Sequence, residues 1–181
     1  MKYLVTGLPR SRTLWMSHFL PDCVHEVAHR LNSVDDLNRI PFGISDSGLG
    51  FFLKEILEDL KVPTVIIDRD PEEVEESLCK MLPHMPATNY CGLLGDFLAA
   101  WQHHPLVLCI RFHDLDARMA EVCAHLGLPY DWERHNRLGH IELGAPTVNY
   151  YAECPPVPGA LFMCKVIPLI HLKEATYVAG S

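Results

Sequence analysis

Residues 7–13 carry the side chains expected of an anion-binding turn. Gly7 ends a short apolar run, and the positions after Pro9 hold two guanidinium groups and two hydroxyls, on Arg10, Ser11, Arg12 and Thr13. A turn that leads into a helix adds unpaired backbone N–H groups to such side chains. The combination indicates a phosphate or sulfate site. The alternative is a surface turn whose arginines are solvated.

The same turn matches only half of the Walker A pattern, G-x-x-x-x-G-K-[ST]. Gly7 occupies the first glycine position, but Arg12 and Thr13 stand where the second glycine and the lysine belong. An ordinary site for a magnesium nucleotide would therefore lack its lysine. A phosphotransferase of the P-loop class remains as a disfavoured alternative.

The elements that position this turn are strands alternating with helices. Short apolar runs predict five strands, at residues 3–7, 23–27, 42–45, 62–67 and 106–110, with helices between and after them, at 12–20, after Ser33, at 51–60, 71–82, 90–102 and 114–126. The fourth run is β-branched and apolar on both faces, as a central parallel strand should be. Such alternation predicts an α/β protein, with helix layers on both sides of a mainly parallel five-stranded sheet.

A second group of polar residues follows the fourth predicted strand. Arg69 comes directly after it, Asp70 and Pro71 supply a cap and a first-turn proline, and Ser77 lies on the helix that follows. Because ligands bind where parallel strands end, an arginine and a serine placed in this way can converge on one phosphate. Taken singly, Arg69 would be a partner for its acidic neighbours and Ser77 a surface hydroxyl.

Together, these two segments resemble the sulfotransferases that use 3′-phosphoadenosine 5′-phosphosulfate (PAPS). Residues 8–15, L-P-R-S-R-T-L-W, are similar to the family's 5′-phosphosulfate loop, P-[RK]-S-G-T-T-W. Residues 66–78 resemble its 3′-phosphate signature, an arginine with a nearby proline and a serine eight positions after the arginine. The resemblance covers about residues 3–140. It implies a P-loop-like fold and transfer of a sulfuryl group from PAPS to a hydroxyl or amine of a small acceptor, with no metal.

The resemblance also implies which residues bind the donor: Pro9, Arg10, Ser11, Arg12, Thr13, Leu14, Trp15, Arg69, Ser77 and Arg137. Arg137 is assigned from a faint R-x-G match, for which Arg134 competes. Trp15 matches a position that stacks on adenine, although an ordinary core tryptophan fits equally well. Arg12 and Leu14 depart from the pattern, since they replace a glycine and a hydroxyl donor. Either Arg12 contacts the anion itself, or the loop does not bind PAPS in the expected way.

Sulfuryl transfer needs a cation for the leaving group and a base for the acceptor proton. Arg10 matches the family's loop cation. His25 and Glu26, at the end of the second predicted strand, are the first candidates for the base, and Asp46, after the third, is the next. The alternatives are a packed strand-end histidine and a helix cap at Asp46.

An alternative interpretation of the sequence points to another class of enzyme. Residues 25–29 form a complete H-E-x-x-H, which on a helix would place His25 and His29 on one face for zinc. Only 24 residues precede the motif, too few for the sheet that such proteases build ahead of their active helix, so zinc proteolysis is a remote alternative. A nucleotide-binding module without turnover is the nearer one.

Charge and cysteine content limit the partners. The net charge is −8, and nine acids against two bases lie between Glu55 and Glu76, so a general affinity for nucleic acid is not expected. Seven cysteines without a C-x-x-C pair fit reduced thiols and a cytoplasmic location. No run is long enough to cross a membrane. Residues 1–140 are predicted to form the nucleotide-binding domain, and the proline-rich residues 141–181 an extension packed on it or on a second subunit of a homodimer.

Overall fold

The fold is described from a computed structural model, in which residues 1–25, 28, 34–81 and 88–139 are described. All of them belong to one compact unit, Met1–Leu143. The expected C-terminal extension, residues 141–181, lies outside the described residues, as do Glu26, His29 and Ser33.

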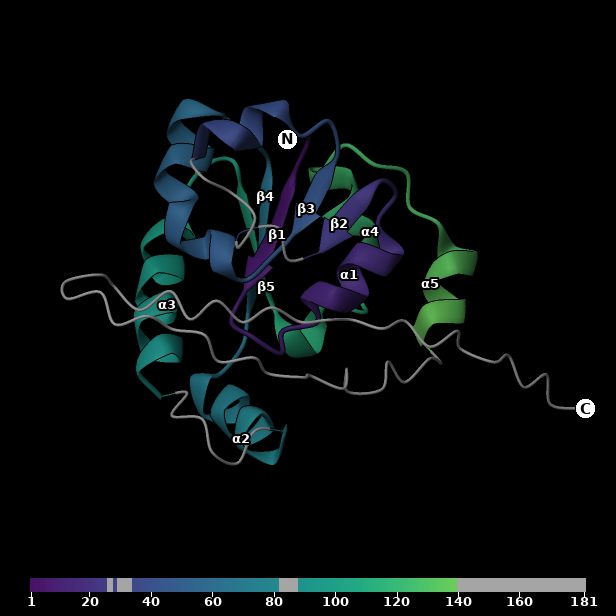
Figure 1. Cartoon of the computed structure of the whole chain (residues 1–181). Helices are drawn as coiled ribbons and strands as arrows, with labels where there is room; N and C mark the ends of the chain where they lie inside the picture. Colours follow the sequence, from purple (N-terminus) through teal and green to yellow (C-terminus); the bar gives the residue numbers. More distant parts are fainter. Residues whose placement is uncertain (26–27, 29–33, 82–87, 140–181) are drawn as a thin grey trace, which may run out of the picture. The chain divides into compact units, whose positions relative to one another are not determined.

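A five-stranded, all-parallel sheet forms the centre of this unit (Figure 1). The strands are β1 (Leu4–Gly7), β2 (Cys23–His25), β3 (Gly43–Ser45), β4 (Thr64–Asp68) and β5 (Val107–Arg111), in the order β2-β3-β1-β4-β5. β1 pairs with β3 on one side and with β4 on the other, so all four residues of β1 are buried. The predicted fold class and all five predicted strands are confirmed.

Helices cover both faces of the sheet. The α-helices are α1 (Thr13–Phe19), α2 (Pro71–Met81), α3 (Thr88–Trp101), α4 (Met119–His125) and α5 (Trp132–Gly139). The other helical segments are irregular. η2 (Val34–Arg39) is a 3₁₀ helix after Ser33, and η3 (Gly48–Phe52) and η4 (Glu55–Asp59) are the 3₁₀ and π-type parts of one continuous helical run that covers the predicted helix at 51–60. η5 (Phe112–Asp114) is a short 3₁₀ turn after β5. The predicted helix at 114–126 is thus reduced to α4, which ends as expected at Gly127, whose φ of 69° suits a glycine.

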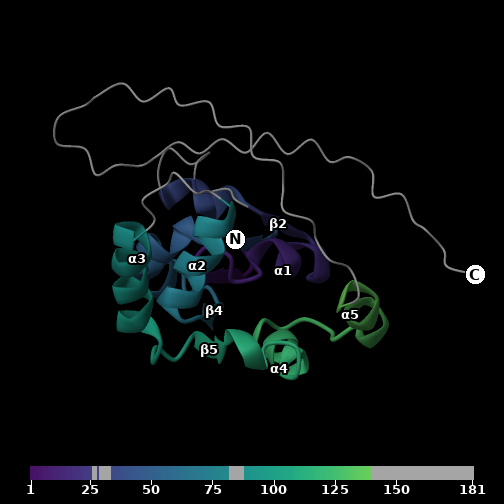
Figure 2. The same ribbon diagram turned by 90° about the horizontal axis from the view of Figure 1, so that it is seen from below.

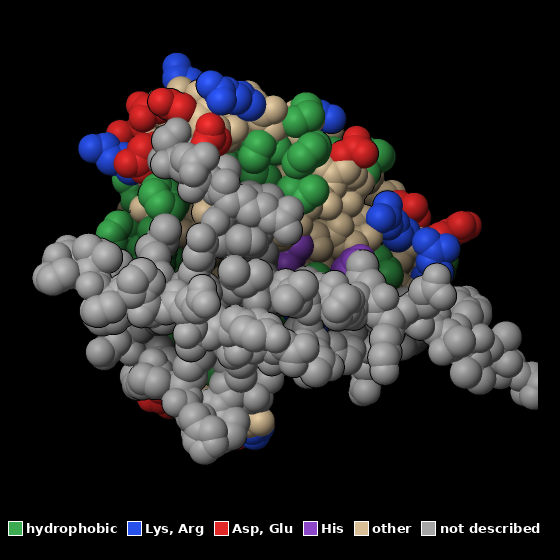
Figure 3. Space-filling model, viewed as in Figure 1, with side chains coloured by type: hydrophobic (Ala, Val, Ile, Leu, Met, Phe, Trp, Pro, Cys, Tyr) green, Lys and Arg blue, Asp and Glu red, His purple; other side chains and the backbone are tan. Residues whose placement is uncertain are grey.

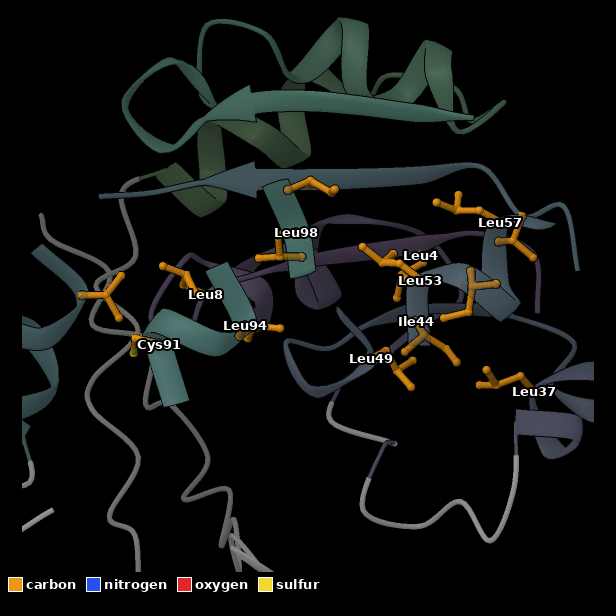
Figure 4. Packing of buried hydrophobic residues seen from close by; sticks show 14 residues of the cluster. Leu4, Leu8, Leu37, Ile44, Leu49, Leu53, Leu57, Cys91, Leu94 and Leu98 are labelled. Carbon is orange, nitrogen blue, oxygen red and sulfur yellow. The ribbon is translucent and has the colours of Figure 1, made fainter. Parts of the chain in front are cut away.

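Alternating strand residues feed two separate cores. Leu4 and Ile66 join a cluster with α3, η3 and η4, whose packing is shown in Figure 4. Val5 and Val65 point the other way, to a cluster with α1 and α4. Figures 1 and 2 show α3 on one side of the sheet and α1 and α4 on the other. The three layers follow from the period-two alternation of the buried strands.

The packing around β1 is close enough to require glycine at the strand's end. A Cβ on Gly7 would lie 2.6 Å from the carbonyl oxygen of Ile67 in β4. Glycine therefore lets β1 and β4 run together to their carboxyl ends, where the two candidate phosphate segments begin.

No helix of the described residues is long and apolar enough to cross a membrane. On the face drawn in Figure 3, the visible Lys and Arg side chains lie among Asp and Glu side chains rather than forming one broad basic surface. The five cysteines within the described ranges are free thiols.

Candidate functional site

The loop between β1 and α1 is held in an unusual backbone conformation. Arg10 and Arg12 both have positive φ, 66° and 60°. A residue other than glycine in this left-handed region costs about 1–3 kcal/mol, and such strain gathers at ligand sites. The loop closes through a backbone hydrogen bond of 3.2 Å from Ser11 N to Leu8 O. The surrounding structure therefore holds both residues in this conformation.

Arg69 connects the two segments that the sequence analysis singled out. It follows β4, which lies beside β1 in the sheet, and its Nη1 donates a hydrogen bond to the backbone carbonyl of Arg10. Its Nε lies 3.4 Å from Glu73 Oε2, and its guanidinium carbon lies 4.0 Å from the centre of the Phe112 ring. The side chain is 14% exposed. A carboxylate, a carbonyl and an aromatic face thus hold Arg69 at the edge of the loop.

Ser77 is the second contact between the segments. Its Oγ accepts a hydrogen bond of 3.2 Å from Arg10 Nε. Arg10 therefore contacts both members of the second segment, Arg69 through its carbonyl and Ser77 through its side chain. The two sequence segments meet at one place on the carboxyl edge of the sheet.

Ser11, in the middle of the loop, is completely buried. Its Oγ has no hydrogen-bond partner among the described residues. A buried hydroxyl without a partner costs about 1–3 kcal/mol, and an anion or a water at the loop would remove that cost.

Arg12 has a different polar partner from the other two arginines. Its Nη1 lies 2.6 Å from Asp116 Oδ1, and its guanidinium carbon lies 5.7 Å from the ring centres of both Trp15 and Phe112. The ion pair spans 104 positions of the sequence. Arg12 thus has a left-handed backbone conformation that favours glycine, while its side chain makes contacts that a glycine could not make.

A solved structure with the same architecture is a sulfotransferase. The mouse sulfotransferase SULT7A1, solved in complex with PAP, matches with a TM-score of 0.55 and 15% identity over 75% of this chain. The chain spans 61% of the length of that mouse protein. This chain has the sulfotransferase fold.

Two further results complete the comparison. The sulfotransferase domain from the curacin biosynthetic pathway matches with a TM-score of 0.44 and 14% identity, over 73% of this chain and 75% of the domain. No protein-family model and no curated protein sequence matches the chain.

Within the sulfotransferase fold, Thr13 and His25 lie together at the ends of α1 and β2. His25 Nε2 is 3.3 Å from Thr13 Oγ1, and the Thr13 carbonyl accepts a hydrogen bond of 2.7 Å from Ser45 Oγ. Burial lowers the pKa of His25 to about 4, although the charge of Asp46 opposes that effect. His25 is therefore a neutral imidazole at pH 7, and its described partner belongs to the loop.

Asp46 has the structural role that the sequence left open. The side chain is buried, and its Oδ1 accepts hydrogen bonds from Gly48 N at 2.7 Å and Leu49 N at 3.3 Å. Its Oδ2 accepts a third, from Ala28 N at 2.7 Å. The carboxylate thus caps η3 and ties it to residue 28. Glu26, the remaining candidate base, lies outside the described residues.

Trp15 is a core residue in this structure. It is 6% exposed, stacks on Phe19 at 5.3 Å with an interplanar angle of 8°, and its Nε1 lies 3.4 Å from the Leu138 carbonyl. This is the core position weighed in the sequence analysis against stacking on a ligand. Leu14, at the loop's other departure from the family pattern, is half-buried.

The two arginines considered for the R-x-G segment both lie on α5. Arg134 donates a hydrogen bond of 2.7 Å to the His18 carbonyl, so it ties α5 to α1. Arg137 is exposed. No contact between Arg137 and the loop of residues 7–13 is seen in the described part of the chain.

The metalloprotease alternative fails at its first residue. His25 is the last residue of β2, so the H-E-x-x-H segment does not begin on a helix. A β-strand forms there instead of a helix because Val24 and His25 pair in register with Ile44 and Ser45 of β3. Among the residues that the structure describes, no group of three metal-binding side chains is found.

Two residues of the site, Phe112 and Asp116, were not predicted from the sequence, and both follow β5. Glu73 is one of the acidic neighbours weighed as a partner for Arg69, and it also lies 3.0 Å from His113 Nε2. A signal existed for Phe112, because β5 is the neighbour of β4 and its end must lie beside Arg69. Nothing local in the sequence connects Asp116 with Arg12.

Proposed function

We propose that this chain is a sulfotransferase that moves a sulfuryl group from PAPS to a hydroxyl or amine of a small acceptor. The observation that carries the proposal is the meeting of the two phosphate segments, in which Arg69 and Ser77 both contact Arg10. PAPS has anionic groups at its 3′ and 5′ positions, so a binding protein needs two clusters of donors on one edge.

The residues at this edge fit such a donor. Arg69 and Ser77 are assigned to the 3′-phosphate, and residues 9–14 to the 5′-phosphosulfate. The buried Ser11 hydroxyl, which has no partner within the described residues, supports an anion at the loop. Because α1 has only seven residues, we assign most of the charge compensation to the arginines and little to the helix dipole.

The donor, when bound, supplies the activated sulfuryl group, and the chain must hold charge and remove a proton. Arg10 is assigned to the leaving group, and its partner Ser77 is neutral. His25 is the better of the two described candidates for the base, since it is neutral at pH 7. Both carboxylate oxygens of Asp46 already accept hydrogen bonds from backbone N–H groups. Glu26 stays a prediction.

A binding module without turnover is the second candidate function. The capping role of Asp46 favours it, because the third candidate base is occupied. Arg12 favours it as well, since a side chain stands at the position where the sulfotransferase loop has a glycine.

Calorimetric titration with adenosine 3′,5′-bisphosphate (PAP) and with Mg-ATP separates these functions from a P-loop phosphotransferase. We expect PAP to bind and Arg69→Ala to weaken that binding about 10- to 100-fold, as loss of a charge-assisted hydrogen bond predicts. Arg39→Ala, which removes an exposed arginine of η2, is the control and should bind PAP like the parent chain. Binding of Mg-ATP but not of PAP would contradict both functions.

Turnover distinguishes the enzyme from the module. Radiolabelled PAPS incubated with a panel of small alcohols, phenols and amines should give labelled product with the parent chain and less with Arg10→Ala. Tight PAP binding without product across the panel would favour the module. The homodimer through residues 141–181, the domain boundary at residue 140 and the cytoplasmic location also stay predictions.

A further inference from the structure

Arg12 is the residue that most clearly sets this chain apart from the sulfotransferase loop pattern. Its φ of 60° is one that glycine adopts freely, yet the chain has an arginine there. The side chain is held by Asp116 Oδ1 at 2.6 Å and lies near the rings of Trp15 and Phe112. Because the backbone at this position favours glycine, the arginine side chain there needs an explanation.

The guanidinium of Arg12 lies near the other cations of the site. The guanidinium carbon of Arg12 lies 5.7 Å from the centre of the Phe112 ring, and that of Arg69 lies 4.0 Å from it. Arg69 in turn reaches the Arg10 carbonyl, two positions before Arg12. Between these two loop arginines lies Ser11, whose buried hydroxyl has no partner in the described part of the chain. Arg12 therefore belongs to the same group of cations, and its guanidinium is paired with a carboxylate of the protein, that of Asp116.

The ion pair of Arg12 with Asp116 is accessible to solvent. The two side chains are 38% and 55% exposed, and an ion pair at such exposure is weak. Burial raises the pKa of Asp116, but the hydrogen bond and charge of Arg12, followed by those of His135, outweigh it and lower the pKa. His135 Nε2 remains 3.6 Å from Asp116 Oδ1. If Arg12 turns away, the Asp116 carboxylate is still hydrated and still has His135 beside it.

We propose that Arg12 is a ligand for the 5′-side anion of the donor nucleotide, and that Asp116 is a positioning residue that holds this guanidinium until the anion replaces it. This inference rests on the proposed function, because it needs a nucleotide at the loop. The group at the 5′ position of the nucleotide decides whether the exchange occurs. Nucleotides with a phosphate or phosphosulfate at the 5′ position recruit Arg12, and nucleotides without one leave it on Asp116.

The test is a mutant cycle measured with two ligands, PAP and adenosine 3′-phosphate, by calorimetry at low salt. Arg12→Gly should weaken PAP binding about tenfold, the effect of one charge-assisted hydrogen bond, and leave adenosine 3′-phosphate unchanged. Asp116→Asn should tighten PAP binding about two- to fivefold, because the competing carboxylate is gone. The tightening should vanish when Asp116→Asn is combined with Arg12→Gly.

Arg12→Gly is expected to fold, since glycine suits the backbone there, and a thermal melt checks this. Arg12→Lys, which keeps the charge, should recover part of the PAP affinity, and Arg39→Ala should change neither ligand's binding. Unchanged or tighter PAP binding by Arg12→Gly, with Arg69→Ala still impaired, would overturn this inference and leave the proposed function standing. Failure of the parent chain to bind PAP would overturn both.

Discussion

Arg69 Nη1 donates a hydrogen bond to the backbone carbonyl oxygen of Arg10, across 59 positions of the sequence. The contact exists because β1 and β4 are parallel neighbours, with Gly7 opposite Ile67, so the residues that follow them emerge at one edge. Brought together in this way, two segments that are each weak signals become a single cluster of cations. The order of the strands is therefore what turns the sequence pattern into a candidate binding site.

Ser77→Ala should weaken PAP binding less than Arg69→Ala does. The Ser77 hydroxyl accepts a hydrogen bond from Arg10 and, in the proposed function, donates one to the 3′-phosphate; because a hydroxyl carries no charge, we expect a loss of about three- to tenfold. Binding of adenosine 5′-phosphate, which lacks the 3′ group, should not change. Ser17→Ala is the matched control, since among the described residues that hydroxyl donates its hydrogen bond to the Leu14 carbonyl of its own turn. Equal losses for the 3′,5′- and 5′-nucleotides would place Ser77 elsewhere in the site.

Asp46→Ala should destabilise the protein rather than act on catalysis alone. Three backbone N–H groups lose their acceptor, and loss of a single cap typically costs about 1 kcal/mol, so we expect a fall of about 2–3 kcal/mol in the free energy of unfolding. Urea denaturation measures it. Asp35→Ala, in the first turn of η2, is a control for the loss of one carboxylate. A variant as stable as the parent chain but without turnover would restore Asp46 as the base.

The neutral, partly buried His25 should make stability fall as the pH drops from 6.5 to 4. Because its pKa is about 4 in the folded chain and near 6.5 when unfolded, the unfolded state binds the extra proton in this window. The contribution is complete above pH 6.5, and roughly 3 kcal/mol of it is lost by pH 4. Urea titrations at pH 7.5 and 5.0 should differ by about 2 kcal/mol from this group.

His25→Gln should remove that part of the pH dependence, because glutamine does not titrate. The control is His103→Gln, at an exposed position before β5, which should keep the full difference between the two pH values. An unchanged difference in His25→Gln would mean that other groups carry it.

Gly43→Ala should unfold or severely destabilise the sheet, whereas Gly92→Ala should stabilise the chain slightly. A Cβ on Gly43 would lie 1.9 Å from Tyr3 Cζ, and that buried ring is fixed by a hydrogen bond of 2.7 Å from its hydroxyl to the Pro21 carbonyl. Gly92 lies in α3, where no atom of the described residues comes within 4 Å of an added Cβ, so alanine there gains about 1 kcal/mol of helix propensity. Thermal melts compare the two. A tolerated Gly43→Ala would show that Tyr3 can leave its place.

The sequence alone was sufficient for the features that depend on neighbouring residues. Its apolar runs predicted the five strands and the three layers, Asp70 and Pro71 predicted the start of α2, and Gly127 the end of α4. The two candidate phosphate segments were also recognised locally, since each lies within about a dozen positions. Strand periodicity, caps and turn residues act over a few bonds, so the order of the residues is enough to predict them.

Only the tertiary structure decided how those side chains are used. Arg12 and Asp116 are 104 positions apart, and Phe112 lies near both Arg12 and Arg69 because β5 stands beside β4. Asp46 accepts a hydrogen bond from Ala28 N, 18 positions away, and the buried Trp15 has its Nε1 3.4 Å from the Leu138 carbonyl. The local sequence of each residue left these roles open. The physical reason is the same in each case. A guanidinium, a carboxylate or an indole takes the partner that strand order and packing bring to it, and that partner is not encoded in its own stretch of chain.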